Sequence, residues 1–185
     1  MEPIILASSS PRRQEILKLL NIPFQVIIPN TDETITQGFS PEEASELIAR
    51  QKISEIIHSK PMGQEIPWIL SADTIILFNG KLYGKPQSHE EAFNFLKEFQ
   101  GKSHEVLTSI VLYNGKTKET VSKTCRTKVT FAKMSDEEIQ WYLDAGGQNW
   151  FNKGITRLCY FEPAETVYCG YRERNIARDA ESMSG

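Results

Sequence analysis

Residues 4–20 read IILASSSPRRQEILKLL and place a short apolar strand, a serine-rich loop and a helix in immediate succession. Ile4 to Leu6 form the strand. Ser10 is in the position of an N-cap and Pro11 in that of the first helical residue, where proline loses nothing because its missing N–H would have no partner within the helix. We expect the helix to bury its apolar residues, which are Ile16, Leu17, Leu19 and Leu20.

Three further helices begin with a shared signature, a serine followed three residues later by a glutamate. This spacing lets two side chains satisfy two backbone N–H groups that have no partner within the helix. Apolar residues follow each pair at helical intervals. We expect the first of these three helices to end at Lys52. The pairs are Ser40 with Glu43, Ser88 with Glu91, and Ser135 with Glu138.

Strand signals lie between the helices. Trp68–Leu70 and Ile75–Phe78 are apolar runs, and Asn79-Gly80 is a strong signal for a two-residue hairpin turn. Val106–Tyr113 predicts a further strand, which Asn114-Gly115 should turn back into a threonine-rich partner. Helices interleaved with hairpins predict an α/β fold with a mixed sheet flanked by helices.

Length and composition favour one soluble globular domain, since the chain has 185 residues with 39% hydrophobic and 24% charged side chains. A formal net charge of −3 argues against binding to long nucleic acid through a broad basic face. No apolar run approaches the roughly 20 residues of a membrane-spanning helix, and no signal core opens the chain. We therefore expect a cytoplasmic protein with no membrane partner.

The three cysteines form an odd set without the C-x-x-C spacing of a zinc site. We expect free thiols at Cys125, Cys159 and Cys169. The helix and strand periodicity fades after Gly147, and the last residues are mostly charged or small. We expect a domain over residues 1–147 and a divergent C-terminal segment of the same domain over 148–185.

The loop Ser8–Arg13 gathers hydroxyl groups, the N–H groups of a helix start and two guanidinium groups. A helix N-terminus attracts anions, and arginine offers paired donors that match phosphate oxygens. The loop therefore predicts a phosphate site, although an N-cap followed by solvated arginines explains the same residues.

Asp73 lies between two apolar strand segments, where a carboxylate is costly unless it is paired, hydrogen-bonded or bound to a metal. It is a candidate to activate water or to hold a divalent cation, and an aspartate in an ordinary turn is the alternative. Lys52, Lys85 and Glu33 are weaker candidates, because exposed lysines and loop carboxylates are common. We expect His104 to be structural.

Taken together, the motifs resemble the Maf family of nucleotide pyrophosphatases. LASSSPRRQEIL over residues 6–17 is followed by TDE at 31–33, ARQK at 49–52 and SADTII at 71–76. GKP at 84–86, GKSHEVLT at 101–108, TKVTF at 127–131 and SDEEI at 135–139 come next. The order and spacing are family-like from about Ile4 to Ala145.

The resemblance implies an elongated fold like that of the inosine triphosphate pyrophosphatases, with a central cleft. It implies cleavage between the α and β phosphates of a nucleoside triphosphate with Mg²⁺ or Mn²⁺, and it leaves open a homodimer. Asp73 would be the general base or a metal ligand. The resemblance further implies that phosphates are bound by Ser8, Arg12, Arg13 and Lys85. It also implies that Glu33 and Lys52 line the cleft and that Glu33 is a metal ligand.

Thr74 after the aspartate, together with Arg12, resembles the family branch that acts on dTTP and UTP. The family's later motifs, among them a glutamine that contacts the base, have no counterpart from Asp144 to Gly185. We interpret this tail as out of frame, through a sequencing error or a real frameshift. A nucleotide-binding regulator of cell division without catalysis and the inactive product of a disrupted gene are the alternative functions.

Overall fold

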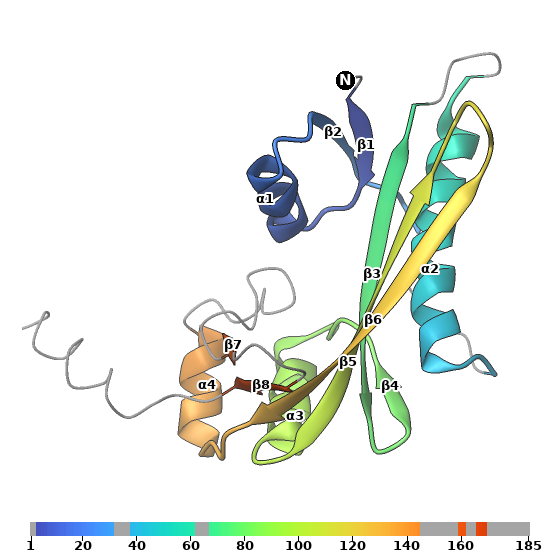
Figure 1. Ribbon diagram of the computed structural model, residues 1–185. Helices are drawn as coiled ribbons and strands as arrows, with labels where there is room; N and C mark the ends of the chain where they lie inside the picture. Colours follow the sequence, from blue (N-terminus) through green and yellow to red (C-terminus); the bar gives the residue numbers. More distant parts are fainter. Residues whose placement is uncertain (1–2, 32–37, 62–66, 145–158, 162–165, 170–185) are drawn as a thin grey trace, which may run out of the picture. The chain divides into compact units, whose positions relative to one another are not determined.

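The computed structural model describes residues 3–31, 38–61, 67–144, 159–161 and 166–169 (Figure 1). They form four helices and eight strands within these ranges. In chain order the elements are β1 (Ile4–Ala7), α1 (Pro11–Leu19), β2 (Phe24–Ile27), α2 (Pro41–Ser59), β3 (Ile69–Phe78), β4 (Lys81–Tyr83), α3 (His89–Phe99), β5 (Ser103–Tyr113), β6 (Thr120–Phe131), α4 (Asp136–Asp144), β7 (Cys159–Phe161) and β8 (Thr166–Cys169).

The chain forms two compact units. The first comprises residues 1–85 and 105–127, and the second comprises residues 86–104 and 128–185. The long strands β5 and β6 contribute residues to both. Every described residue of the predicted site belongs to the first unit.

The first unit contains a mixed sheet. β1 pairs in parallel with β2 and with β3, whereas β3 is antiparallel to β4 and β5. The α/β fold with a mixed sheet is thus confirmed. The predicted elongated shape and central cleft stay predictions.

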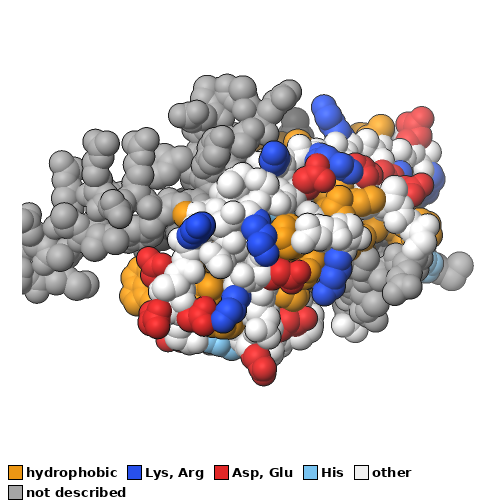
Figure 2. Space-filling view, turned by 90° about the horizontal axis from the view of Figure 1, so that it is seen from below, with side chains coloured by type: hydrophobic (Ala, Val, Ile, Leu, Met, Phe, Trp, Pro, Cys, Tyr) orange, Lys and Arg blue, Asp and Glu red, His pale blue; other side chains and the backbone are white. Residues whose placement is uncertain are grey.

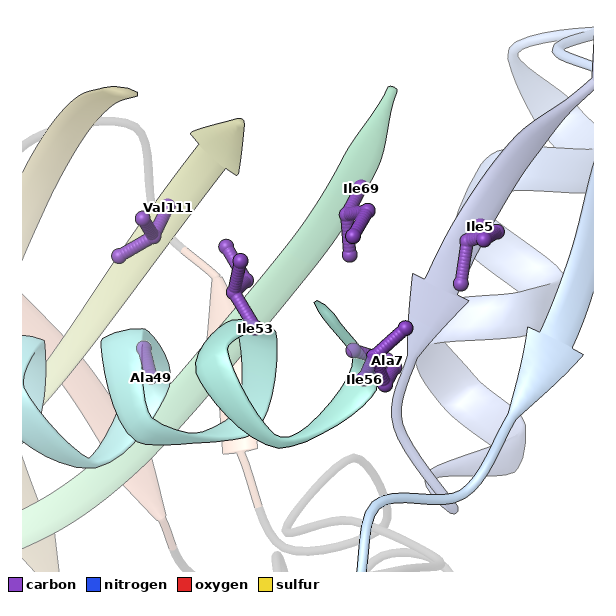
Figure 3. Packing of buried hydrophobic residues seen from close by; sticks show 7 residues of the cluster. All are labelled: Ile5, Ala7, Ala49, Ile53, Ile56, Ile69 and Val111. Atoms are coloured by element: carbon purple, nitrogen blue, oxygen red, sulfur yellow. The ribbon is translucent and has the colours of Figure 1, made fainter. Parts of the chain in front are cut away.

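Helix α2 covers one face of this sheet. Its residues Ala49, Ile53 and Ile56 pack against Ile5 and Ile69 of the sheet, and Val111 joins the same cluster (Figure 3). All are nearly inaccessible to solvent. Burial of aliphatic side chains stabilises the fold by about 25 cal/mol per Å² of apolar surface, so this cluster contributes to the stability of the first unit.

The start of α2 agrees with its predicted capping box, but its end does not. The Ser40 Oγ accepts from the Glu43 backbone N–H at 3.3 Å, and the Glu43 carboxylate accepts from the Ser40 N–H at 2.8 Å. The helix then runs for 19 residues, so the prediction that it ends at Lys52 is wrong. Lys52 lies on the buried face of α2, between Ile48 and Ile56. In the sequence a lysine at this position was interpreted as the end of the helix.

Strand β3 is continuous from Ile69 to Phe78, so the two apolar runs predicted as separate segments are one strand and Asp73 lies inside it. The hairpin at Asn79-Gly80 is confirmed, with φ of 49° and 76° at the two residues and β3 antiparallel to β4. These are left-handed values, which asparagine and glycine tolerate best.

The chain also turns back at the second predicted place. β5 ends at Tyr113 and β6 begins at Thr120, so Asn114-Gly115 opens a connection of six residues. The Asn114 side-chain oxygen accepts from the backbone N–H of Lys116 at 3.0 Å, and the left-handed residue is Lys118. Asparagine therefore acts here through its side chain and not through its backbone conformation.

Helix α1 buries less than its apolar pattern predicts. Leu17 is 4% exposed, whereas Ile16, Leu19 and Leu20 are 48%, 82% and 61% exposed. The helix has only nine residues, and its buried face is a single residue wide. The prediction of a broad buried face is therefore wrong for three of four residues.

The second unit joins α3 and α4 to the ends of β5 and β6. β6 pairs in parallel with β8, and β7 pairs antiparallel with β8. The predicted serine caps of α3 and α4 are present, since Ser88 Oγ accepts from the Glu91 N–H and Ser135 Oγ from the Glu138 N–H. At α3, the Glu91 carboxylate accepts from the Gln87 N–H and not from the N–H of the N-cap residue Ser88, so the capping box is incomplete.

His104 is a buried histidine of this second unit. It is 2% exposed, and its ring lies 5.0 Å from the Phe99 ring and 4.7 Å from the Phe131 ring, measured between centroids. Neither ring nitrogen has a hydrogen-bond partner among the described residues. Burial lowers the pKa of His104 from 6.5 to about 4.

The surface carries charges of both signs. Figure 2 shows lysine, arginine and acidic side chains interspersed over one face, with hydrophobic side chains between them. Within the described part of the chain, no helix is both long and apolar enough to cross a membrane.

Candidate active site at the interrupted edge of strand β3

The predicted site residues gather where one edge of β3 is interrupted. β5 pairs along the other edge, opposite Ile69 to Leu77. β1 and β4 must therefore share the remaining edge, where β1 pairs with residues 69–71 and β4 with residues 76–78. Residues 72–75 lie between these two pairings, and this short interval contains Asp73 and Thr74.

The carbonyl oxygen of Ala72 is the point at which two cations meet. It accepts a hydrogen bond from Arg13 Nη1 at 2.8 Å and from Lys52 Nζ at 3.4 Å. Arg13 comes from α1 and Lys52 from α2. The interrupted edge thus brings together side chains from helices that lie far apart in the sequence.

Lys52 also forms an ion pair with Asp73. Its Nζ lies 2.7 Å from Asp73 Oδ1, and the two residues are only 3% and 5% exposed. Isolated charges at such depth would be very costly, and pairing offsets that cost. The Ser45 hydroxyl, also buried, donates to the Asp73 carbonyl at 3.4 Å and ties α2 to the same point of β3.

Ser8 organises the loop that precedes α1. Its buried Oγ accepts from the Ser10 backbone N–H and from Arg13 Nη1, both at 3.1 Å. Ser10 is the N-cap residue of α1, as predicted, but its side chain makes no capping hydrogen bond. In contrast to α2, the N-terminus of α1 has no serine cap, which leaves it suited to an anion.

The two arginines of α1 differ in their surroundings. Arg13 contacts Ser8, Ala72 and Thr74. Arg12 Nη2 is buried, yet no hydrogen-bond partner is found for it within the described ranges. A buried charged donor without a partner costs more than the 1–3 kcal/mol or so of a neutral one, so a bound anion would relieve this cost.

Thr74 extends the cluster to the neighbouring strand. Its Oγ1 accepts from Arg13 Nη2 at 3.4 Å and lies 3.1 Å from Thr108 Oγ1 of β5. Sequence reasoning did not identify Thr108, nor the Ala72 carbonyl. A backbone oxygen has no sequence signature, and Thr108 becomes visible only when the register pairs it with Thr74.

Lys85 flanks the cluster. It is exposed and lies two residues after Tyr83, the β4 residue paired with Ile76. The structure thus brings five of the predicted residues together. Lys85 follows the end of β4 by two residues. Those five are Ser8, Arg13, Lys52, Asp73 and Thr74. Glu33 lies outside the described residues.

Of the two predicted metal ligands, only Asp73 lies among the residues that the structure describes. In the described ranges, no three His, Cys, Asp or Glu side chains form a metal-ligand group. Mg²⁺ is commonly bound by one or two carboxylates together with substrate phosphates and water. The residues present therefore fit a cation that arrives with a phosphorylated ligand, and they do not form an all-protein metal cage.

Comparison with known proteins identifies close relatives. The chain is 38% identical over 141 residues to a dTTP/UTP pyrophosphatase of Bacillus velezensis, covering 76% of this chain and 71% of that protein. It is 40% identical over 146 residues to a dTTP/UTP pyrophosphatase of Halalkalibacterium halodurans, covering 79% of this chain and 74% of that protein.

A solved structure, a nucleoside-triphosphatase (dITP/XTP pyrophosphatase) of Mycobacterium abscessus, matches with a TM-score of 0.41 and 14% identity. The match covers 72% of this chain and 74% of the other, and it is too distant to support an argument. The model of the family described as Maf-like protein matches residues 3–154. This chain belongs to the Maf family.

Proposed function

We propose that this protein hydrolyses nucleoside triphosphates, with dTTP and UTP preferred, to the nucleoside monophosphate and pyrophosphate. Relatives at 38% and 40% identity are dTTP/UTP pyrophosphatases, and the match to the family model, residues 3–154, includes the whole cluster around β3. The cluster itself supports a polyanionic substrate.

The observation that carries the proposal is the gathering of cationic side chains at the interrupted edge. Arg13 and Lys52 both donate to the Ala72 carbonyl, and Arg12 precedes Arg13 on α1. The buried Arg12 Nη2, which has no hydrogen-bond partner among the described residues, supports binding of an oxygen anion there. A triphosphate supplies such oxygens.

The binding roles follow from these surroundings. Arg12 and the N-terminus of α1 would bind phosphate oxygens directly, with Ser8 and Arg13 fixing the loop that presents them. Lys85 is exposed and would bind the terminal phosphates through its ammonium group. Thr74 lies on the opposite face of β3 from Asp73 and would contribute to recognition of the nucleotide.

The reaction needs a water molecule to attack the α phosphorus while the bond from that phosphorus to the α–β bridging oxygen breaks. Pyrophosphate leaves with the bridging oxygen, and the water oxygen stays on the nucleoside monophosphate. Asp73 would accept the water's proton, since a carboxylate accepts hydrogen bonds through both of its oxygens and can act as a general base.

Mg²⁺ or Mn²⁺ would be held by Asp73 and by the phosphate oxygens, and Glu33 is the second ligand that we propose from the sequence. When bound, such a cation neutralises charge on the phosphates and favours departure of pyrophosphate. Lys52 would keep the Asp73 carboxylate in one orientation towards water and cation.

We also propose that residues 1–147 form the catalytic part of the domain and that the enzyme acts in the cytoplasm. Residues 148–185 would be a C-terminal segment of the same domain that is out of frame, through a sequencing error or a real frameshift. The family model ends at residue 154, near the proposed boundary. A homodimer is compatible with this account. Resequencing of the gene tests the frameshift: a clean reading of this tail in an active protein would refute it.

Product analysis tests the proposed function. The purified chain would be incubated with Mg²⁺ and, in turn, dTTP, UTP, CTP, GTP and 7-methyl-GTP, with ³¹P NMR of the products. We expect pyrophosphate and monophosphate from dTTP and UTP. Release of inorganic phosphate with a diphosphate would contradict the cleavage site, and tight nucleotide binding without any product would favour the regulator.

A further inference from the structure

We propose that the main-chain N–H of Thr74 binds a phosphate oxygen of the substrate at the interrupted edge of β3. This inference rests on the proposed function, because it adds a hydrogen-bond donor to the same phosphate site. The Thr74 side chain is part of the cluster, and the peptide group is a second, independent feature of the same residue.

The direction of the Thr74 N–H follows from the hydrogen bonds of β1. The Ile5 N–H donates to the Trp68 carbonyl at 2.8 Å, so the main-chain groups of Trp68 face β1. Successive residues of a strand direct their N–H and C=O groups to alternate edges. The register of β3 with β5 is continuous from Ile69 to Leu77, without a bulge. Thr74, six residues after Trp68, therefore directs both of its main-chain groups to the edge shared by β1 and β4.

This N–H lies in the interval that neither neighbouring strand covers. The pairing with β1 stops at Ser71, and the pairing with β4 begins at Ile76. Extension of the β4 register by two residues would place Lys85 opposite Thr74, but β4 ends at Tyr83. Among the described residues, no hydrogen bond to the Thr74 main chain bridges this interval. A partly buried main-chain donor in such a position is costly unless a ligand or water binds it.

The surroundings of the N–H favour an anionic oxygen as its partner. In a strand, the carbonyl of one residue and the N–H two residues later are neighbours on the same edge. The neighbour of the Thr74 N–H is thus the Ala72 carbonyl, which accepts from Arg13 and Lys52. An oxygen that accepts from the Thr74 N–H therefore lies close to a guanidinium and an ammonium group, and both stabilise negative charge.

The position of the N–H also suits the proposed reaction. Thr74 directly follows Asp73, the proposed general base, whose carboxylate pairs with Lys52 of α2. A main-chain N–H within a strand is a rigid donor, so it fixes a phosphate oxygen without the entropy cost of ordering a long side chain. The N–H would thus hold the phosphate beside the carboxylate that activates water.

The size of the effect is that of a hydrogen bond to a charged acceptor. Loss of such a bond weakens binding by about 10- to 100-fold. We therefore expect removal of this one N–H to raise the Kd for inorganic triphosphate and the KM for dTTP at least about tenfold. The Tm of the ligand-free protein should change little, because no hydrogen bond to a neighbouring strand is lost.

An amide-to-ester substitution removes the N–H and keeps the strand. The hydroxy-acid counterpart of valine would be incorporated in place of Thr74 in the whole chain. Thr74→Val is its reference, because it has the same side chain and retains the N–H. An ester also weakens the preceding carbonyl as an acceptor, which here is that of Asp73, a residue paired with β5.

Ile76 provides a matched control on the same strand. Its N–H points to the same edge as that of Thr74, but Ile76 pairs with Tyr83 of β4. An ester at Ile76, made with the hydroxy-acid counterpart of isoleucine, weakens the carbonyl of Ile75, which also pairs with β5. The two esters thus share one effect and differ in the role of the lost N–H. The Ile76 ester should lower the Tm more than the Thr74 ester does, and it should leave KM unchanged.

The decisive measurements are the Kd for inorganic triphosphate, the KM for dTTP and the Tm of the wild type, Thr74→Val and the two esters. We expect the Thr74 ester to bind at least about tenfold more weakly than Thr74→Val, with a similar Tm. Equal Kd and KM in these two proteins, or a loss of binding of the same size in the Ile76 ester, would overturn the proposal.

Hydrogen exchange in the wild-type chain gives a second test that needs no substitution. The Thr74 N–H should exchange faster than the Ile76 N–H in the ligand-free protein, and inorganic triphosphate should slow its exchange. An exchange rate at Thr74 that saturating triphosphate does not change would also overturn the proposal.

The binding measurement separates this proposal from the proposed function. If the wild-type chain hydrolyses no nucleotide but binds inorganic triphosphate, the proposed activity is wrong, and the affinities still decide the role of Thr74. If the wild type hydrolyses dTTP and the Thr74 ester matches Thr74→Val, only the role of the N–H is wrong. If the wild-type chain binds no inorganic triphosphate, both proposals are wrong.

Discussion

Lys52 Nζ lies 2.7 Å from Asp73 Oδ1, and both residues are at least 95% buried. The pair joins the middle of α2 to the middle of β3. Its geometry gives the proposed catalytic carboxylate a fixed partner and makes it sensitive to any change at Lys52. Stability and activity should therefore be coupled at this pair.

Lys52→Met should destabilise the protein strongly, because it leaves a buried carboxylate without its charged partner. Breaking such a pair typically costs about 3–5 kcal/mol. Urea denaturation would measure the loss. Lys97→Met is the control, since Lys97 forms an exposed ion pair with Asp136 at the same 2.7 Å distance. The exposed pair should contribute less than about 1 kcal/mol. Equal losses in the two variants would contradict the buried-pair account.

Arg12→Met should weaken substrate binding without weakening the fold. The substitution removes a buried Nη2 that has no hydrogen-bond partner among the described residues, so the melting temperature should stay constant or rise. The KM for dTTP should rise at least tenfold. Arg13→Met provides the contrast, because it removes contacts with Ser8, Ala72 and Thr74 and should lower the melting temperature. A loss of stability in Arg12→Met with unchanged KM would show that Arg12 is structural.

Removal of divalent cations should abolish activity and leave the fold intact. The described residues contain no group of three metal-binding side chains, so the cation should bind well only together with substrate phosphates. Calorimetry should find weak Mg²⁺ binding to the protein alone and much tighter binding with a non-hydrolysable dTTP analogue present. Tight binding of one Mg²⁺ without nucleotide, or full activity in EDTA, would contradict this account.

His104 should make the fold sensitive to acid. Burial lowers its pKa from 6.5 to about 4, so the unfolded chain binds more protons than the folded chain between these two values. The contribution of neutral His104 to the free energy of unfolding is complete above about pH 6.5. It is lost progressively as the pH falls to about 4, and the total loss is roughly 3 kcal/mol. His104→Phe should flatten the dependence of unfolding free energy on pH in this window. His58→Gln, at an exposed histidine, should not, and an unchanged slope in His104→Phe would refute the assignment.

The local features of the fold were predictable from sequence, because the signals for them are local. The serine–glutamate pairs predicted where helices begin, and Asn79-Gly80 predicted its hairpin. The end of α2 was not predictable in this way. Lys52 looks like a terminal residue until the structure pairs it with Asp73, 21 positions along the chain.

The candidate site depends on pairings that have no local signal. Asp73 was identified from its apolar surroundings, but its position inside a continuous β3, between the residues paired with β1 and with β4, follows only from the register. Thr108 was missed for the same reason. The apolar pattern of α1 predicted burial of Leu19, which is 82% exposed, because a pattern does not state whether another element covers it.

Pyrophosphate release from dTTP by Asp73→Asn, measured beside the wild type, tests the central claim most directly. Asparagine keeps the volume of the side chain and removes its charge, and Asp136→Asn is the control at an exposed carboxylate outside the cluster. We expect wild-type rates in Asp136→Asn and a decrease of at least about 100-fold in Asp73→Asn, the scale of a lost general base. A folded Asp73→Asn protein that releases pyrophosphate at the wild-type rate would contradict the assignment of the active site to the interrupted edge of β3.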